Sequence, residues 1–154
     1  MCIRDRDQAA DWSGAAAAYQ ENLEIWRDIA SKHKDDASIQ HDLINALVNA
    51  ALAAIEAGQD AQGLALSDEA IGIAPKELWP HNTRADALML LGRTGEARQI
   101  YLAHRGEHSQ SGESWEDSVK FDFATFRKIG LANSLMAEIE ADFALPPKAA
   151  GGGN

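Results

Sequence analysis

The chain has 154 residues, a formal net charge of −10 at pH 7, 45% hydrophobic residues and four prolines. This length is enough for one domain with a core of its own, and the richness in alanine and leucine favours helix. No apolar run reaches the ~20 residues that a membrane span needs, and an acidic surface repels phosphate backbones. We therefore expect a helical, cytoplasmic protein whose partners are neither membranes nor nucleic acids.

Residues 1–6 have a composition unlike the rest of the chain. They resemble the translation of a transposon-end adapter used in sequencing libraries. We expect this segment to be an artefact that contributes nothing to the fold, which implies that the chain is a fragment of a longer protein. The segment also holds the only cysteine, Cys2, so no disulfide, cysteine-bound metal or cysteine nucleophile is expected.

A long first helix is predicted from Asp7 to about Lys34. Its large apolar residues recur at helical spacing along one stripe, which holds Tyr19, Leu23, Trp26, Ile29 and Ala30. In a paired-helix unit another helix, upstream of this one, would cover the stripe. Without that helix, Trp12 and Tyr19 are expected to be exposed and to favour weak self-association.

Glycine, proline and capping residues divide the remaining chain into shorter helices. Asp35 or Asp36, Thr94, Ser114 and Asn133 are predicted to cap helix starts because their side chains accept hydrogen bonds from free backbone N–H groups. The predicted helices span residues 37–57, 60–74, 78–91, 94–104, 115–128 and 134–143. The stretch 146–154 is predicted to be a disordered tail.

Two of the predicted turns are related by a shift of 34 residues. Gly58 then falls on Gly92 and Gly63 on Ala97. A shift of 48 residues toward the start of the chain places Gly63 on Ala15, and the 14 extra residues equal about four helical turns. The first hairpin is therefore expected to be a lengthened copy of the same unit.

A 34-residue period of paired helices is the signature of a tetratricopeptide repeat, and the chain resembles that family. The residues that carry the resemblance are Ala70, Ile71, Ile73, Pro75, Ala85, Ala87, Leu88, Gly92, Ala97 and Tyr101. The resemblance implies an all-α fold, a right-handed antiparallel helix-hairpin solenoid over residues 7–145. Its repeats would span about 7–34, 37–74 and 78–105, and the aromatic segment 114–143 would form a helical C-terminal cap.

The long first hairpin and the aromatic ending also resemble a group of bacterial multidomain proteins. In that group a tetratricopeptide array follows a caspase-like or other effector domain. The resemblance implies an upstream enzymatic or signalling domain in the parent protein, and it implies no catalysis for the residues in hand.

In tetratricopeptide arrays the first helix of each pair lines a concave surface that binds peptides. The resemblance places six residues of this chain there: Asn45, Asn49, Leu52, Trp79, Asn82 and Asp86. Asn45 and Asn49 project together from one turn of helix, and an amide can donate to and accept from a peptide backbone. The alternatives are that the asparagines are ordinary polar surface and that Trp79 packs in the core.

Some members of the family hold a C-terminal carboxylate with lysine and arginine beside paired asparagines. Here the corresponding helices lack lysine, and Arg84 is the only basic candidate. A carboxylate clamp for chaperone C-termini is therefore not expected.

His104, Glu107 and His108 have the spacing H-x-x-E-H, which resembles the signature of inverzincin metalloproteases. That chemistry needs both histidines on one face of a rigid helix and a third ligand. Gly106 interrupts the motif at a predicted helix end, and no third ligand stands out. The simpler interpretation is a solvated helix end whose basic side chains suit the helix dipole.

The sequence thus predicts a protein–protein interaction or scaffolding module with no enzymatic activity, no cofactor and no metal. The partner would be a protein or peptide held on the concave face. Two alternatives stay open: a purely structural C-terminal cap of a larger protein, and a metal-dependent hydrolase using the H-x-x-E-H motif.

Overall fold

A computed structural model describes the backbone of residues 6–146 and side chains from Asp11 onward. The adapter-like residues 1–5 and the stretch 147–154 lie outside the described residues, as does most of the predicted tail. The described part is all-α, as predicted, and contains no strand. Its helices are α1 (Arg6–Lys32), α2 (Ala37–Glu56), α3 (Asp60–Ile73), α4 (Leu78–Leu90), α5 (Thr94–Ala103), α6 (Trp115–Lys128) and α7 (Ser134–Ala144).

Side-chain caps start three of these helices where the sequence predicts them. Asp36 accepts from the backbone N–H groups of Ser38 and Ile39 at 3.0 and 3.2 Å. Ser114 and Asn133 begin α6 and α7 in the same way. These bonds satisfy N–H groups that have no partner inside the helix, so the helix starts could be predicted from local sequence.

The predicted Thr94 cap is wrong. The residue before α5 is Arg93, which makes no side-chain cap bond. Arg93 instead forms two 2.7 Å hydrogen bonds with Glu96 in the first turn. The acid is well placed there because a negative charge near a helix N-terminus is favourable.

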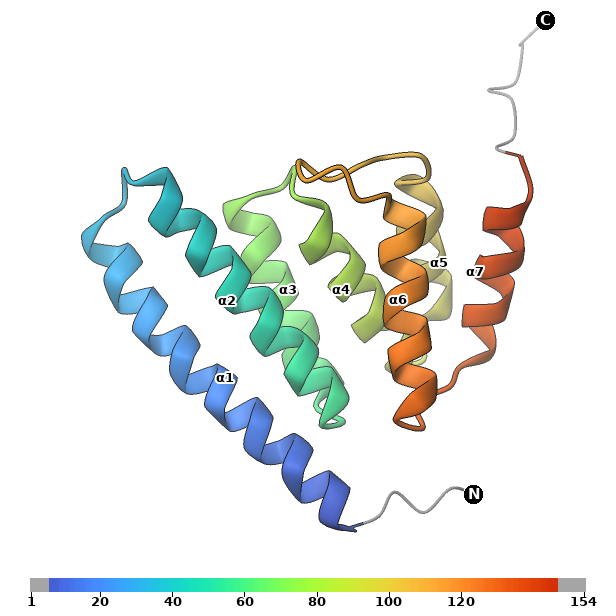
Figure 1. The fold of residues 1–154 in the computed structure, drawn as a ribbon, viewed down its shortest axis with the longest axis horizontal. Helices are drawn as coiled ribbons and strands as arrows, with labels where there is room; N and C mark the ends of the chain where they lie inside the picture. The colour runs from blue at the N-terminus through green and yellow to red at the C-terminus, as the bar shows by residue number, and fades with distance from the viewer. Residues whose placement is uncertain (1–5, 147–154) are drawn as a thin grey trace, which may run out of the picture.

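Alternate helices form two layers (Figure 1). Each of the first four helices packs on the next one in the sequence, α2 also contacts α4, α4 contacts α6, and α5 contacts α7. Side chains link α1 to α3, since Arg27 bonds Glu69 and Gln62 bonds Gln20. One layer therefore holds α2, α4 and α6, and the other holds α1, α3, α5 and α7. The final two helices extend both layers.

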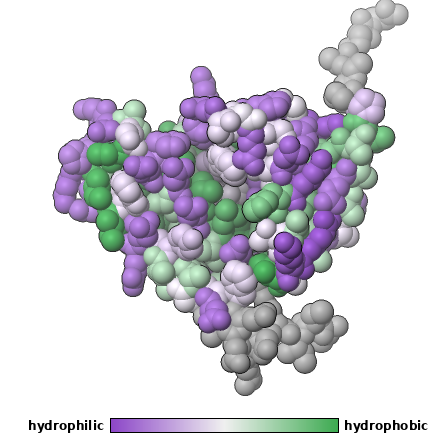
Figure 2. Space-filling view, viewed as in Figure 1, coloured by the Kyte–Doolittle hydropathy of each residue, from purple (hydrophilic) through white to green (hydrophobic). Residues whose placement is uncertain are grey.

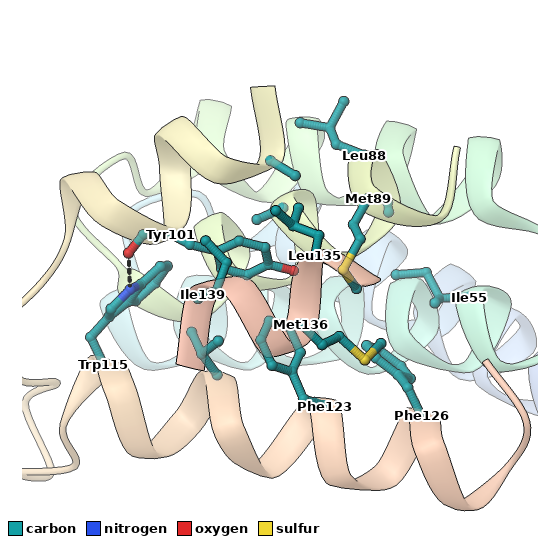
Figure 3. Close-up of a cluster of buried hydrophobic side chains, with 14 residues drawn as sticks. Ile55, Leu88, Met89, Tyr101, Trp115, Phe123, Phe126, Leu135, Met136 and Ile139 are labelled. Carbon is teal, nitrogen blue, oxygen red and sulfur yellow. Dashed lines mark hydrogen bonds between the residues drawn. The ribbon is translucent and has the colours of Figure 1, made fainter. Parts of the chain in front are cut away.

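Buried side chains form two clusters. One lies among α1, α2 and α3 and includes Leu23, Leu47 and Leu66. The larger one joins α4 to the last three helices and is rich in aromatic side chains, with Tyr101 and Phe123 in edge-to-face contact at 5.3 Å (Figure 3). The second cluster anchors α6 and α7 to the rest of the fold.

None of the residues that the structure describes covers the outer side of α1. Tyr19 is 45% exposed and Ile25 is 59% exposed, whereas Trp12 is half-buried. Hydrophobic residues appear at the edge of the molecule that α1 occupies, in the middle of the face and near α7, with hydrophilic residues between them (Figure 2). None of the helices within residues 6–146 has both the length and the hydropathy required to cross a membrane.

Candidate functional site

A hollow of about 530 Å³ lies between α2 and α4. The loop that joins α5 to α6 runs back across the start of α4 and forms its third side (Figure 1). We call this hollow the α2–α4 groove. Its lining residues are His41, Ile44, Asn45, Val48, Asn49, Leu52, Glu77, Trp79, Pro80, Ser109, Gln110 and Ser111.

Four of the six residues predicted to bind a partner line this groove. Asn45 and Asn49 are exposed on α2, one turn apart, and Leu52 follows on the same helix. Trp79 stands on the opposite side, 40% exposed. The groove therefore combines two exposed side-chain amides with apolar surface, the mixture of groups that ligand-binding sites use.

The loop side of the groove was not predicted. Gln110 Nε2 donates to Glu77 Oε1 at 3.1 Å and ties the loop to the start of α4. Within the loop, Ser109 N donates to Glu113 O at 2.9 Å, and Trp115 N donates to Glu107 O at 2.9 Å. This stretch is polar, but its path across α4 depends on where α6 packs.

The other two predicted residues, Asn82 and Asp86, lie elsewhere. Both sit on α4 beneath α6, with 1% and 0% of their surface exposed. Asn82 Nδ2 donates to Asp122 Oδ2 at 2.6 Å, and Tyr101 Oη donates to Asp86 Oδ1 at 2.6 Å. The expectation that they line an open face is wrong, because α6 occupies the part of α4 that the repeat pattern leaves free.

These contacts bring two carboxyl groups together, that of the fully buried Asp86 and that of the half-buried Asp122. Burial, reinforced by the charge of Asp122, raises the pKa of Asp86 well above its usual value. Burial likewise raises the pKa of Asp122 from 3.8 to about 7, with smaller contributions from the charges of Glu56 and Glu113. Within the described residues, Asp86 Oδ2 and Asn82 Oδ1 have no hydrogen-bond partner. Because two nearby carboxylates repel each other, this pair gives up its last proton at a higher pH than an exposed aspartate does.

The H-x-x-E-H residues do not face one another as metal ligands. His104 Nδ1 lies 3.1 Å from Glu107 Oε1, and the His104 ring packs 4.8 Å from that of Trp115. His108 pairs with Ser114 in a single β-bridge. In the part of the chain that the structure describes, no group of three or more His, Cys, Asp or Glu residues could hold a metal ion. The packing of His104 on Trp115 instead anchors the loop.

Arg84, the basic candidate for a carboxylate clamp, faces away from the groove. Its Nε donates to Asp68 Oδ1 on α3 at 2.7 Å. The groove lining includes neither lysine nor arginine. The groove therefore lacks the fixed positive charge that binds a terminal carboxylate.

No family model matches this chain, and neither a curated protein nor a solved structure matches it significantly.

Proposed function

We propose that this chain is a protein–protein interaction module and that its α2–α4 groove binds an extended peptide of a partner protein. The proposal rests on one observation: the side chains of Asn45, Asn49 and Trp79 all line one hollow of about 530 Å³. A peptide binder needs polar groups for the peptide backbone and an apolar surface for side chains. The groove supplies both from rigid helices.

The chemistry of the lining defines the ligand. An asparagine amide donates and accepts at once, so Asn45 and Asn49 together can bond one N–H and one C=O of an extended strand. Trp79 and Leu52 offer apolar area for one bulky side chain. Glu77 is the acid in the lining. A basic residue of the peptide, next to its bulky apolar residue, would therefore make a favourable charge contact with Glu77.

We further propose that the fold is a tetratricopeptide-like solenoid. Its support is the alternation of helices between two layers and the shared burial of Gly63 and Ala97, the small residues related by the 34-residue shift. Small residues at these positions let paired helices approach closely: a Cβ on Gly63 would lie 2.5 Å from Ile55 Cγ1. In such an array the layer of α2 and α4 carries the binding surface.

Selection of random displayed peptides on the immobilised chain tests the binding proposal. We expect selected peptides to share a bulky apolar residue and to bind the double variant Asn45→Ala/Asn49→Ala about 30-fold more weakly, since two hydrogen bonds of about 1 kcal/mol each are lost. Gln99→Ala is the matched control, because it removes an exposed amide on α5. Equal weakening in the control, or no selected peptide, would contradict the proposal.

A second candidate function is a structural cap of a larger protein with no ligand. The observation that favours it is the burial of Asn82 and Asp86 beneath α6, which fills part of the predicted binding face with the chain's own residues. This alternative predicts that the selection yields no peptide that competes for the α2–α4 groove.

A further inference from the structure

Side chains of α2 line the α2–α4 groove in two rows. The polar row holds three exposed residues, His41, Asn45 and Asn49. The apolar row holds three residues that are buried or half-buried, Ile44, Val48 and Leu52. Members of each row follow one another at intervals of four residues, so they lie on one side of the helix, a turn apart. The groove therefore repeats a polar contact and an apolar contact along its length.

The repeat distance of these rows determines which conformation of a bound chain fits. Four residues of α-helix advance about 6 Å. In a β-strand, residues two apart present their N–H and C=O groups to the same edge, about 6.6 Å from each other. A polyproline II helix presents equivalent groups only at every third residue, about 9.3 Å apart, and an α-helix bonds its own backbone groups. Asn45 and Asn49 therefore match the repeat distance of a strand.

The apolar row matches the side chains of the same strand. Residues two apart in a strand place their side chains on one face, and the residues between them face the other way. The apolar row, with Trp79 40% exposed on the opposite side of the groove, gives one set of side chains a surface to cover. The other set then faces solvent. A strand that fits the groove therefore alternates apolar and polar residues.

Charge and fold content indicate which protein supplies the strand. The lining has one acid, Glu77, and neither lysine nor arginine, so a polar residue of the strand near Glu77 should be basic. A second copy of this chain is a poor source, because residues 6–146 contain no strand and each chain carries a net charge of −10. A segment of a different protein is the occupant that fits.

We propose that the α2–α4 groove binds a partner segment in β-strand conformation, whose backbone bonds to Asn45 and Asn49 at residues two apart. This inference holds only if the groove binds a peptide, as proposed above, and it adds the class of segment. The segment has apolar side chains two residues apart that face the apolar row, and polar side chains between them, with a basic one near Glu77. Proline does not fit at the two bonded residues, because it has no backbone N–H group.

An amide-to-ester scan of the tightest selected peptide tests this proposal. Each ester replaces one backbone N–H with oxygen, which removes a hydrogen-bond donor and changes the shape little. Fluorescence anisotropy measures binding of each ester peptide to the unaltered chain, to Asn45→Ala and to Asn49→Ala. An ester at a bonded residue should weaken binding to the unaltered chain about fivefold, the loss of one typical hydrogen bond. The same ester should have almost no effect on the variant that lacks its partner asparagine.

The separation between the two coupled peptide residues distinguishes a strand from the other conformations. We expect the residue whose ester loses its effect in Asn45→Ala and the residue whose ester loses its effect in Asn49→Ala to lie two apart in the peptide. The matched control is Gln99→Ala, which removes an exposed amide on α5. Every ester should weaken binding to this control as much as it weakens binding to the unaltered chain.

Two results would overturn the strand proposal and leave peptide binding intact. The first is a pair of coupled residues with any separation other than two, such as the three of a polyproline II helix. The second is a scan in which no ester weakens binding by more than about twofold, as expected for a helical segment or for recognition by side chains alone. Failure to select any peptide would overturn the binding proposal and this inference together.

Discussion

The change Asp122→Asn should stabilise the protein at neutral and alkaline pH and have little effect near pH 4. Asp122 lies on α6 against the fully buried Asp86 and accepts a hydrogen bond from Asn82 at 2.6 Å. An asparagine keeps that acceptor and replaces the other oxygen with an NH₂ group that carries no charge. The substitution therefore removes the ionisation of a half-buried group and leaves its shape unchanged.

The pH window follows from the direction of the shift. The pKa of Asp122 is about 7 in the folded protein and 3.8 without the fold, so the unfolded chain loses this proton first. The free energy of unfolding then falls as pH rises from about 4 to about 7 and levels off above that range. A rise in pKa from 3.8 to about 7 corresponds to about 4 kcal/mol. Because Asp86 is coupled to this ionisation, we expect about 2 to 4 kcal/mol.

Urea unfolding followed by circular dichroism, at several pH values between 4 and 9, measures the difference in free energy of unfolding between Asp122→Asn and the unaltered protein. Acids with a lowered pKa, such as Glu96 and Glu140, make stability depend on pH in the opposite sense. They are present in both proteins and cancel in the comparison. A gap between Asp122→Asn and the unaltered protein that is the same at every pH would refute the assignment of a shared proton to the Asp86–Asp122 pair.

Two further changes test the packing that positions the site. Gly63→Ala should lower the free energy of unfolding by about 1 to 3 kcal/mol, because its Cβ would lie 2.5 Å from Ile55 Cγ1. The same change should lower the free energy of unfolding by less when Ile55 is already replaced by alanine. An equal loss in both proteins would contradict the close contact. Tyr101→Phe should cost about 1 to 3 kcal/mol in urea unfolding, because Asp86 Oδ1 loses a buried 2.6 Å hydrogen bond; no loss of stability would show that the Tyr101 hydroxyl is not bonded there.

Local signals were enough to predict the helices. Capping side chains such as Asp36 and Ser114 act within three residues, and glycine at positions 58 and 92 takes a φ near +80° that other residues rarely adopt. The tetratricopeptide resemblance assigned Asn45 and Asn49 to the binding face, and helical spacing predicts that the two share one side of α2.

The burial of Asn82 and Asp86 could not be read from their own helix. It depends on α6, whose Asp122 comes 40 residues after Asn82. One signal was present: Asp122 lies beside Phe123 and one turn after Ser118, at the edge of the buried stripe of α6. A polar residue on an apolar stripe needs a buried partner, but the sequence does not say which one.

The central claim is that the α2–α4 groove binds a peptide without opening the fold. An ¹⁵N–¹H correlation spectrum recorded with a selected peptide tests it directly, because asparagine amides and tryptophan indoles each give a separate signal. We predict that the side-chain signals of Asn45, Asn49 and Trp79 shift, while the indole of Trp115, bonded to Tyr101 O at 2.8 Å, does not. Unmoved signals from the first three residues, or a shift of Trp115 with them, would contradict the claim.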